Sequence, residues 1–161
     1  MPMVECRTLY GKSKWIDINR LIQRPSVYGL VARDQQVLLV MTQFTRKYCL
    51  PGGAIEKGEG IEAALEREFK EETGIAVQVE DFARFETNFF YYDPLDMAIH
   101  GFLFFYYCTP LTFNLLSGDD AAAIEDVDVS HPVWVDIADL SEDSFQTHGA
   151  LTMQMIRALV Q

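Results

Sequence analysis

A run of 23 residues, from Gly53 to Ile75, places a glycine-rich loop directly before three closely spaced glutamates. Glu68, Glu71 and Glu72 repel one another unless positive charge lies among them. Carboxylate oxygens are the ligands that hard divalent cations prefer, and the backbone of a glycine loop can approach an ion or a phosphate closely. The spacing therefore indicates a divalent metal and phosphate chemistry.

The three glutamates lie on a predicted helix. Gly60 to Thr73 is rich in Glu, Ala, Leu and Lys, and Gly74 supplies a C-terminal stop. At about 100° per residue, Glu68 and Glu72 project within about 40° of the centre of the apolar stripe, and Glu71 lies about 95° away. Two inward carboxylates without a partner would cost several kcal/mol, so they require protonation or a cation. The stripe consists of Ile61, Ala64, Leu65 and Phe69.

A solvated charged face is the alternative for any glutamate-rich helix. Glu62 and Glu66 fit that alternative, because they lie on the other side of the helix, where both can pair with Lys70. Arg67 projects elsewhere, and we expect its guanidinium to brace a carboxylate or a loop carbonyl.

The same residues form a recognisable signature. In order, it consists of Gly53, five residues, Glu59, seven residues, Arg67-Glu68-Phe69, one residue, Glu71-Glu72, one residue and Gly74-Ile75. This pattern resembles the Nudix box, GX5EX7REUXEEXGU with U an aliphatic or aromatic residue, at every defined position. The resemblance implies an α/β protein with the Nudix-type α/β/α sandwich and a mixed β-sheet. It also implies hydrolysis of a nucleoside diphosphate linked to another moiety, assisted by Mg²⁺ or Mn²⁺.

The resemblance further implies a role for each residue of the box. Arg67 would orient the glutamates, and Glu59 would support the loop or a water beyond the ligands. The implied metal ligands are Glu68, Glu71, Glu72 and the Gly53 carbonyl. A general base must accept the proton of the attacking water, and Glu68 is our first choice. The alternative is an acid of the polar segment that contains Asp119, Asp120, Glu125, Asp126 and Asp128.

Residues outside the box must recognise the substrate. Five residues could stack on a base or hold a phosphate, with core packing as the alternative for the aromatic ones: Phe44, Arg46, Phe89, Tyr91 and Tyr92. Tyr91 and Tyr92 lie at about the distance beyond the box where some dinucleoside polyphosphate hydrolases carry tyrosine. Pro94 does not match the proline typical of ADP-ribose hydrolases. A nucleoside triphosphate, a dinucleoside polyphosphate and a nucleotide sugar all stay open as the substrate.

Strands must position the loop and the helix. Ser26 to Arg33 and Val37 to Thr42 predict two core strands joined by a tight turn. Further strands are predicted over residues 48–50, 76–79, 82–92, 99–108 and 133–135. Gly149 to Val160 predicts a final amphipathic helix with Leu151, Met155 and Leu159 along one side.

The N-terminal residues 1–23 would hold a short hairpin, formed by Val4 to Leu9 and Lys14 to Ile18. No linker divides the chain, so we expect residues 1–161 to form a single domain. The outer edge of the hairpin could pair two copies into a homodimer.

The charge balance narrows the class of partner. Thirteen Lys and Arg against twenty-four Asp and Glu give a net charge of −11, which opposes binding to long nucleic acid or to anionic lipid. The most apolar run, residues 97–108, is shorter than the roughly 20 residues that span a bilayer. We therefore expect a small nucleotide-derived molecule as partner, and no membrane.

The cysteines and histidines carry no further site. Cys6, Cys49 and Cys108 are odd in number and far apart, which is typical of reduced thiols in a cytoplasmic protein. The three histidines have no metal-binding companion at a useful spacing, so we expect ordinary core or surface roles for them.

Two functions from different classes follow. The first is a metal-dependent pyrophosphohydrolase that cleaves the diphosphate link of a small nucleoside diphosphate derivative. The second is a catalytically inactive Nudix-like domain that binds nucleotides or regulates a partner. The intact set of Glu68, Glu71 and Glu72 favours the enzyme, because a binding domain has no evident need for all three.

Overall fold

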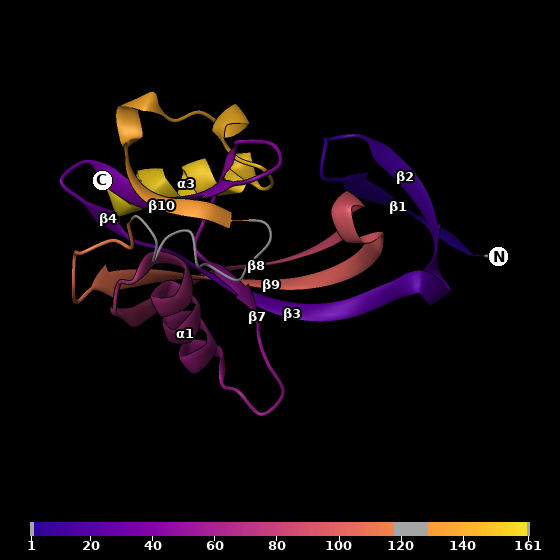
Figure 1. The fold of residues 1–161 in the computed structure, drawn as a ribbon, viewed down its shortest axis with the longest axis horizontal. Helices are drawn as coiled ribbons and strands as arrows, with labels where there is room; N and C mark the ends of the chain where they lie inside the picture. Colours follow the sequence, from indigo (N-terminus) through magenta and orange to yellow (C-terminus); the bar gives the residue numbers. More distant parts are fainter. Residues whose placement is uncertain (1, 118–128, 161) are drawn as a thin grey trace.

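The chain folds into two β-sheets with a long helix on either side (Figure 1). The computed structural model describes residues 2–117 and 129–160. The longer sheet has the strand order β2-β1-β8-β9-β3-β7, and its members are β1 (Met3–Thr8), β2 (Ser13–Asp17), β3 (Leu21–Leu30), β7 (Gly52–Ala54), β8 (Val77–Tyr92) and β9 (Met97–Pro110). The shorter sheet has the order β10-β5-β4 with β6 paired to β5, and comprises β4 (Ala32–Arg33), β5 (Gln36–Thr42), β6 (Tyr48–Cys49) and β10 (Val129–Asp136).

The helices of the described part are α1 (Ile61–Thr73) and α3 (Gly149–Leu159). Short 3-10 turns also occur at Ile18–Arg20, Asp93–Leu95, Ile137–Asp139 and Glu142–Ser144.

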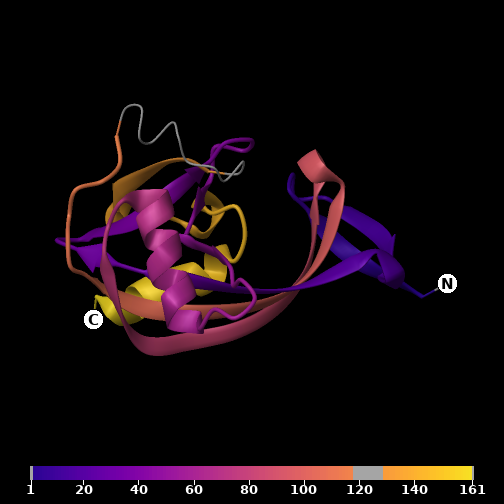
Figure 2. The ribbon, with the colours of Figure 1, turned by 60° about the horizontal axis from the view of Figure 1, so that its bottom comes forward.

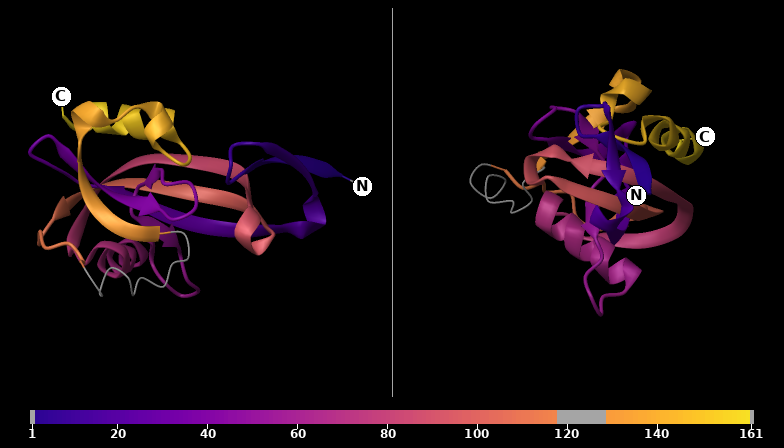
Figure 3. Two further views of the ribbon diagram at one scale, coloured as in Figure 1. Left: turned by 45° about the horizontal axis from the view of Figure 1, so that its top comes forward. Right: turned by 90° about the vertical axis from the view of Figure 1, so that its right-hand side faces the viewer.

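The two helices cover opposite sides of the sheets (Figure 3, left). On one side, α1 packs into a cluster of buried side chains that includes Val27, Leu38, Leu65, Phe69 and Ile75. On the other side, α3 packs into a second cluster that includes Leu39, Phe105, Leu151, Met155 and Ile156. Burial of these apolar side chains supplies the main favourable contribution to folding.

The longer sheet contains both kinds of strand pair. β3 runs parallel to β9 from Leu21↔Ala98 to Leu30↔Tyr107, and β1 runs parallel to β8. β8 and β9 are antiparallel, as are β3 and β7. The sequence prediction of an α/β fold, an α/β/α sandwich with a mixed sheet, is confirmed.

Residues 3–17 form the hairpin that the sequence predicts, with β1 and β2 paired from Met3↔Asp17 to Arg7↔Ser13. The hairpin extends the longer sheet at the end remote from α1 (Figure 2). A small buried cluster of Cys6, Ile16, Tyr91 and Ala98 attaches it to β8 and β9.

Several predicted strands differ in extent from the observed ones. β8 is one strand of 16 residues, because bulges between Val79 and Arg84 join the segments 76–79 and 82–92 that the sequence predicts as separate strands. β3 begins at Leu21 rather than at Ser26, and the chain changes sheets after Leu30. Ala32–Arg33 pairs with β5 across the predicted tight turn, and the Leu38 N–H donates to the Val31 carbonyl.

The last helix buries a different set of residues from the one predicted. Leu151 and Met155 are buried as expected, but Leu159 is 39% exposed, and Thr152, Met153 and Ile156 are buried instead. The five acids considered as an alternative general base, Asp119 to Asp128, lie outside the described residues. In the described part of the chain, no helix is both long and apolar enough to cross a membrane.

Candidate active site

Helix α1 carries the predicted acids in the predicted directions. It begins after Gly60 and ends at Gly74, which adopts the left-handed conformation with φ +79°. Glu72 is 2% exposed, and the side chain of Glu68 is 12% exposed. The Glu71 side chain, on the flank, is 58% exposed. The inward placement of Glu68 and Glu72 was therefore correctly predicted from helix geometry.

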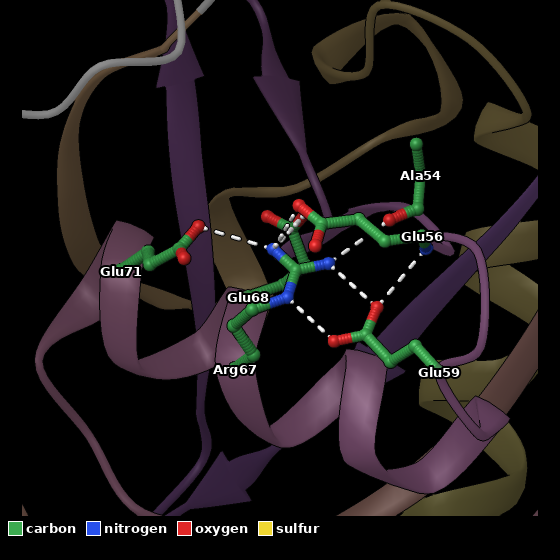
Figure 4. Close-up of polar contacts among 6 residues, drawn as sticks. All are labelled: Ala54, Glu56, Glu59, Arg67, Glu68 and Glu71. Carbon is green, nitrogen blue, oxygen red and sulfur yellow. Dashed lines mark hydrogen bonds and ion pairs between the residues drawn. The ribbon is translucent and has the colours of Figure 1, made fainter.

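Arg67 connects these acids to the preceding loop (Figure 4). Its Nε and Nη2 donate to the two carboxylate oxygens of Glu59 at 2.7 and 2.9 Å. Nη2 also donates to the carbonyl oxygen of Ala54 at 3.1 Å, and Nη1 donates to Glu68 at 3.0 Å and to Glu71 at 3.2 Å. The guanidinium thus braces both a carboxylate and a loop carbonyl, as predicted.

Glu59 holds the other end of this connection. Its Oε1 also accepts a hydrogen bond from the Glu56 backbone N–H at 3.1 Å, so it joins the loop to the helix. The hydrogen bonds from Arg67, and then the one from Glu56, lower the pKa of Glu59 to about 2. The pKa of Arg67 is raised in turn, chiefly by its hydrogen bonds to Glu59. Both side chains are therefore charged across the physiological pH range.

Glycines 52 and 53 let the loop pass close to the helix. Strand β7 pairs with β3 at Val27↔Gly53 and Tyr28↔Gly52. At Gly52, φ is +149° and a β-carbon would collide with the carbonyl oxygen of Val27, so the position requires glycine. A β-carbon at Gly53 would lie 2.7 Å from Glu68 Oε1. The backbone of Gly53 therefore lies directly against the Glu68 carboxylate.

Glu68 and Glu72 lie side by side in this confined space. Burial, the largest effect, raises the pKa of Glu68, while hydrogen bonds with Glu72 and Arg67 act in the opposite direction. Two adjacent carboxylates cannot both be ionised at low cost, so the pair must share a proton or be neutralised by positive charge, part of which Arg67 supplies to Glu68.

The donor set suits a hard divalent ion, because it consists of carboxylate oxygens beside a glycine backbone. Within residues 2–117 and 129–160, however, no three or more His, Cys, Asp or Glu side chains are grouped closely enough to hold an ion as they stand. In Figure 4, Nη1 of Arg67 lies between Glu68 and Glu71 and donates a hydrogen bond to each.

A cavity of about 310 Å³ opens beside these acids. It is enclosed by one face of strands β3, β8 and β9, by the loop after β5 and by the start of α3. Gly53 and Glu72 line one part of it. Apolar and aromatic side chains form most of the remaining wall, among them Tyr28, Phe90, Tyr92, Ile99, Leu103 and Phe105. A mainly apolar cavity that also holds polar groups is typical of small-molecule sites.

The model of the NUDIX domain matches residues 22–155 of the chain. This chain belongs to the Nudix family. An "ADP-ribose pyrophosphatase" of Methanocaldococcus jannaschii is 31% identical over 117 residues, which are 70% of this chain and 67% of that protein. "Putative nudix hydrolase 1" of Caenorhabditis elegans is 29% identical over 124 residues, and the matched part is 72% of this chain but only 28% of that protein.

A solved structure of similar fold is the NUDIX hydrolase from Nitrosomonas europaea, with a TM-score of 0.64 and 13% identity over 83% of this chain and 70% of that one. The prediction of a Nudix hydrolase, an enzyme that acts on pyrophosphate bonds, is confirmed by the family match.

The structure brings together only some of the substrate residues predicted outside the Nudix box: Phe44 and Tyr92 line the cavity, and Arg46, Phe89 and Tyr91 do not. Phe44 lines the cavity, is 42% exposed and meets Tyr92 edge-on at 6.5 Å between ring centroids. Arg46 is exposed, adopts φ +62° and does not line the cavity. Tyr91 is 5% exposed on the opposite face of β8, where its hydroxyl donates to Asp96. Its neighbours Phe90 and Tyr92 line the cavity in its place, because side chains alternate along a strand.

Several residues at the cavity were not singled out from the sequence for a functional role. They are Arg24, Tyr28, Asn88, Gly101 and His148. Burial raises the pKa of Tyr28 to about 12, and burial lowers the pKa of His148. Alternation along β3 and β8 is the sequence signal that could have placed Arg24 with Tyr28, and Asn88 with Phe90 and Tyr92.

Proposed function

We propose that this Nudix hydrolase is a metal-dependent pyrophosphohydrolase that cleaves the diphosphate link of a small nucleoside diphosphate derivative. The observation that carries the proposal is the pair of adjacent inward carboxylates, Glu68 and Glu72, in a site where Glu72 and Gly53 also line the cavity. A ligand in the cavity can thus bring a diphosphate to buried oxygen ligands.

Glu68, Glu71, Glu72 and the Gly53 carbonyl would hold Mg²⁺ or Mn²⁺. When bound, such an ion neutralises charge on the diphosphate oxygens and lowers the pKa of a water molecule at the site. Arg67 keeps Glu68 and Glu59 in place, so that the acids do not have to be arranged anew for each turnover.

Glu68 is our choice for the general base. Its Oε1 accepts the hydrogen bond from Arg67, which leaves Oε2 to take the proton of the attacking water. Burial raises the pKa of this carboxyl, which brings its proton affinity closer to neutral pH and favours proton transfer. Attack on phosphorus then breaks one P–O bond of the P–O–P link, and the leaving phosphate keeps the bridging oxygen.

Nucleotide sugars are the substrates that we would assay first for hydrolysis. The Methanocaldococcus jannaschii relative is described as an ADP-ribose pyrophosphatase, and ADP-ribose is a nucleoside diphosphate linked to a sugar. This adds ADP-ribose to the nucleoside triphosphates, dinucleoside polyphosphates and nucleotide sugars that the sequence leaves open.

The test is a panel of these four substrate types with Mg²⁺ or Mn²⁺, with products identified by chromatography. We expect hydrolysis of at least one substrate, with a nucleoside monophosphate among the products, and loss of turnover on chelation with EDTA. Absence of turnover across the whole panel would instead favour the nucleotide-binding or regulatory domain.

A further inference from the structure

Three residues from three neighbouring strands form a row on the floor of the cavity. Arg24 of β3 is in register with Gly101 of β9, and Gly101 is in register with Asn88 of β8. All three line the cavity. Because adjacent strands lie about 4.8 Å apart, Arg24 and Asn88 stand on either side of Gly101, with their backbones about 10 Å apart.

Two polar atoms of this row have no hydrogen-bond partner among the residues that the structure describes. They are Nε of Arg24 and Oδ1 of Asn88, and both are buried. A buried polar atom left in this state costs about 1–3 kcal/mol. Unpaired buried atoms are uncommon in folded proteins, so a donor and an acceptor at the floor of one cavity indicate a ligand that pairs with both.

Gly101 makes room for this arrangement. A β-carbon at position 101 would collide with Oδ1 of Asn88, so the amide lies over the glycine. The amide nitrogen of Asn88 is 3.5 Å from Nε2 of His148, on the other side of the amide group. The oxygen is therefore the part of the amide that faces the floor.

The chemistry of the row selects one class of ligand. A phosphate at neutral pH offers only acceptor oxygens, so it could pair with Arg24 but would leave Asn88 Oδ1 without a donor. The edge of a nucleobase carries a ring or carbonyl acceptor next to an N–H donor, and it can pair with both atoms. Ile99, Leu103 and Phe90, on the same face as the row, supply the apolar contact that a flat ring requires.

We propose that the row Arg24–Gly101–Asn88 is the subsite for the nucleobase of the substrate. The inference rests on the proposed function, because it takes the substrate to be a nucleotide derivative. Gly53 is in register with Val27, three residues along β3 from Arg24, which corresponds to about 10 Å. This distance leaves room for the sugar between the base at the row and the diphosphate at Glu72.

The test measures binding without turnover. Isothermal titration of the full chain in EDTA compares four nucleoside 5′-monophosphates with ribose 5-phosphate, which has the sugar and the phosphate but no base. We expect at least one nucleoside monophosphate to bind about tenfold or more tightly than ribose 5-phosphate. Arg24→Gln should weaken that nucleotide by about tenfold or more and leave ribose 5-phosphate within about twofold.

Two further variants address the other members of the row. Asn88→Ala should weaken the nucleotide by about three- to tenfold, and Gly101→Ala should weaken it by displacing the amide. These variants keep the test valid if Arg24→Gln does not fold, which circular dichroism would reveal. Arg157→Gln is the matched control, because it makes the same charge change at an exposed position of α3 and should alter neither affinity.

Two outcomes would overturn the subsite. Equal weakening of nucleotide and ribose 5-phosphate by Arg24→Gln would make Arg24 a phosphate ligand. Wild-type protein that binds no nucleoside monophosphate more tightly than ribose 5-phosphate would remove the base subsite altogether. Nucleotide binding of the expected kind in a chain that hydrolyses nothing would instead retain the subsite and refute the proposed function.

Discussion

Arg67 uses its guanidinium to connect five acceptors on the loop and the helix. A lysine could not reproduce this pattern, because its ammonium lacks the planar fork that contacts both oxygens of Glu59. The loop meets the helix carboxylates through this side chain and through the close approach at Gly53. We therefore propose that Arg67 acts on catalysis by positioning Glu68 and Glu59.

The pair formed by Arg67 and Glu59 predicts a pH-dependent stability difference. The pKa of Glu59 is about 2 in the folded protein, against an ordinary value of 4.5. A lowered pKa stabilises the folded state fully above the ordinary value, and that contribution is lost as the pH falls through the folded one. Urea unfolding of wild type and Glu59→Gln should thus differ by a constant amount above about pH 5, and the difference should shrink from about pH 4.5 to pH 2. A difference that stays the same at pH 3 and pH 7 would show that Glu59 is not held by charge.

In the loop that ends at α1, two glycines are constrained by different neighbours, one by backbone and one by a side chain. Gly52 is held by its backbone, since any β-carbon there meets the Val27 carbonyl. At Gly53 the nearest atoms belong to the end of the Glu68 side chain, which can move. A substitution at Gly53 therefore tests the active site rather than the fold.

Gly53→Ala should lower kcat by about 10- to 100-fold, because the added carbon pushes the Glu68 carboxylate out of position. The free energy of unfolding should change by no more than about 1 kcal/mol. Gly60→Ala is the control, since a β-carbon there meets open space and should leave kcat unchanged. A wild-type kcat in Gly53→Ala would mean that Glu68 needs no fixed position.

The elements differ in how far the sequence predicts them. Helix α1 was predicted almost to the residue, because its apolar stripe, its glycine boundaries and its acids all have helical spacing. β3 was predicted too short, since Arg24 and Pro25 interrupt its apolar pattern at the point where the strand lines a cavity. β8 was divided in two, because polar residues at a bulge look like a turn when the partner strand is unknown.

The two halves of the site differ in the same way. Glu68 and Glu72 share one helix, so local geometry was enough to predict their common direction. Arg24, Gly101 and Asn88 come from three strands far apart in the sequence, and only the register of the sheet brings them into one row. Tyr91 was a poor choice for a related reason, because a shift of one residue along a strand reverses the face.

At the scale of the whole molecule, the net negative charge contrasts with the need to bind a negatively charged diphosphate. The chain carries a net charge of −11, yet the cavity contains Arg24 and offers Glu72 to a cation. Local positive groups must therefore attract a diphosphate against the overall field. This arrangement favours small ligands that enter the cavity over long polyanions.

The N-terminal hairpin predicts the state of assembly. β2 is the outermost strand of the longer sheet, and Trp15 on it is 62% exposed. Open strand edges with apolar side chains favour pairing with another chain. Size-exclusion chromatography with light scattering should give twice the chain mass of 18.4 kDa for wild type and the single mass for Trp15→Lys. Leu111→Lys, at another exposed apolar position, should stay dimeric. A monomeric wild type would contradict the homodimer.

The metal-dependent hydrolysis proposed for the whole molecule depends most directly on Glu72. Its carboxylate is 2% exposed, and replacement by glutamine removes an ion ligand while it relieves repulsion with Glu68. Glu72→Gln should therefore fold normally and lose about 100-fold or more in kcat on the best substrate of the panel at saturating Mg²⁺. Glu66→Gln, which makes the same change on the exposed side of α1, should keep the wild-type rate. A wild-type rate in a folded Glu72→Gln would contradict the assignment of the carboxylates as the metal site.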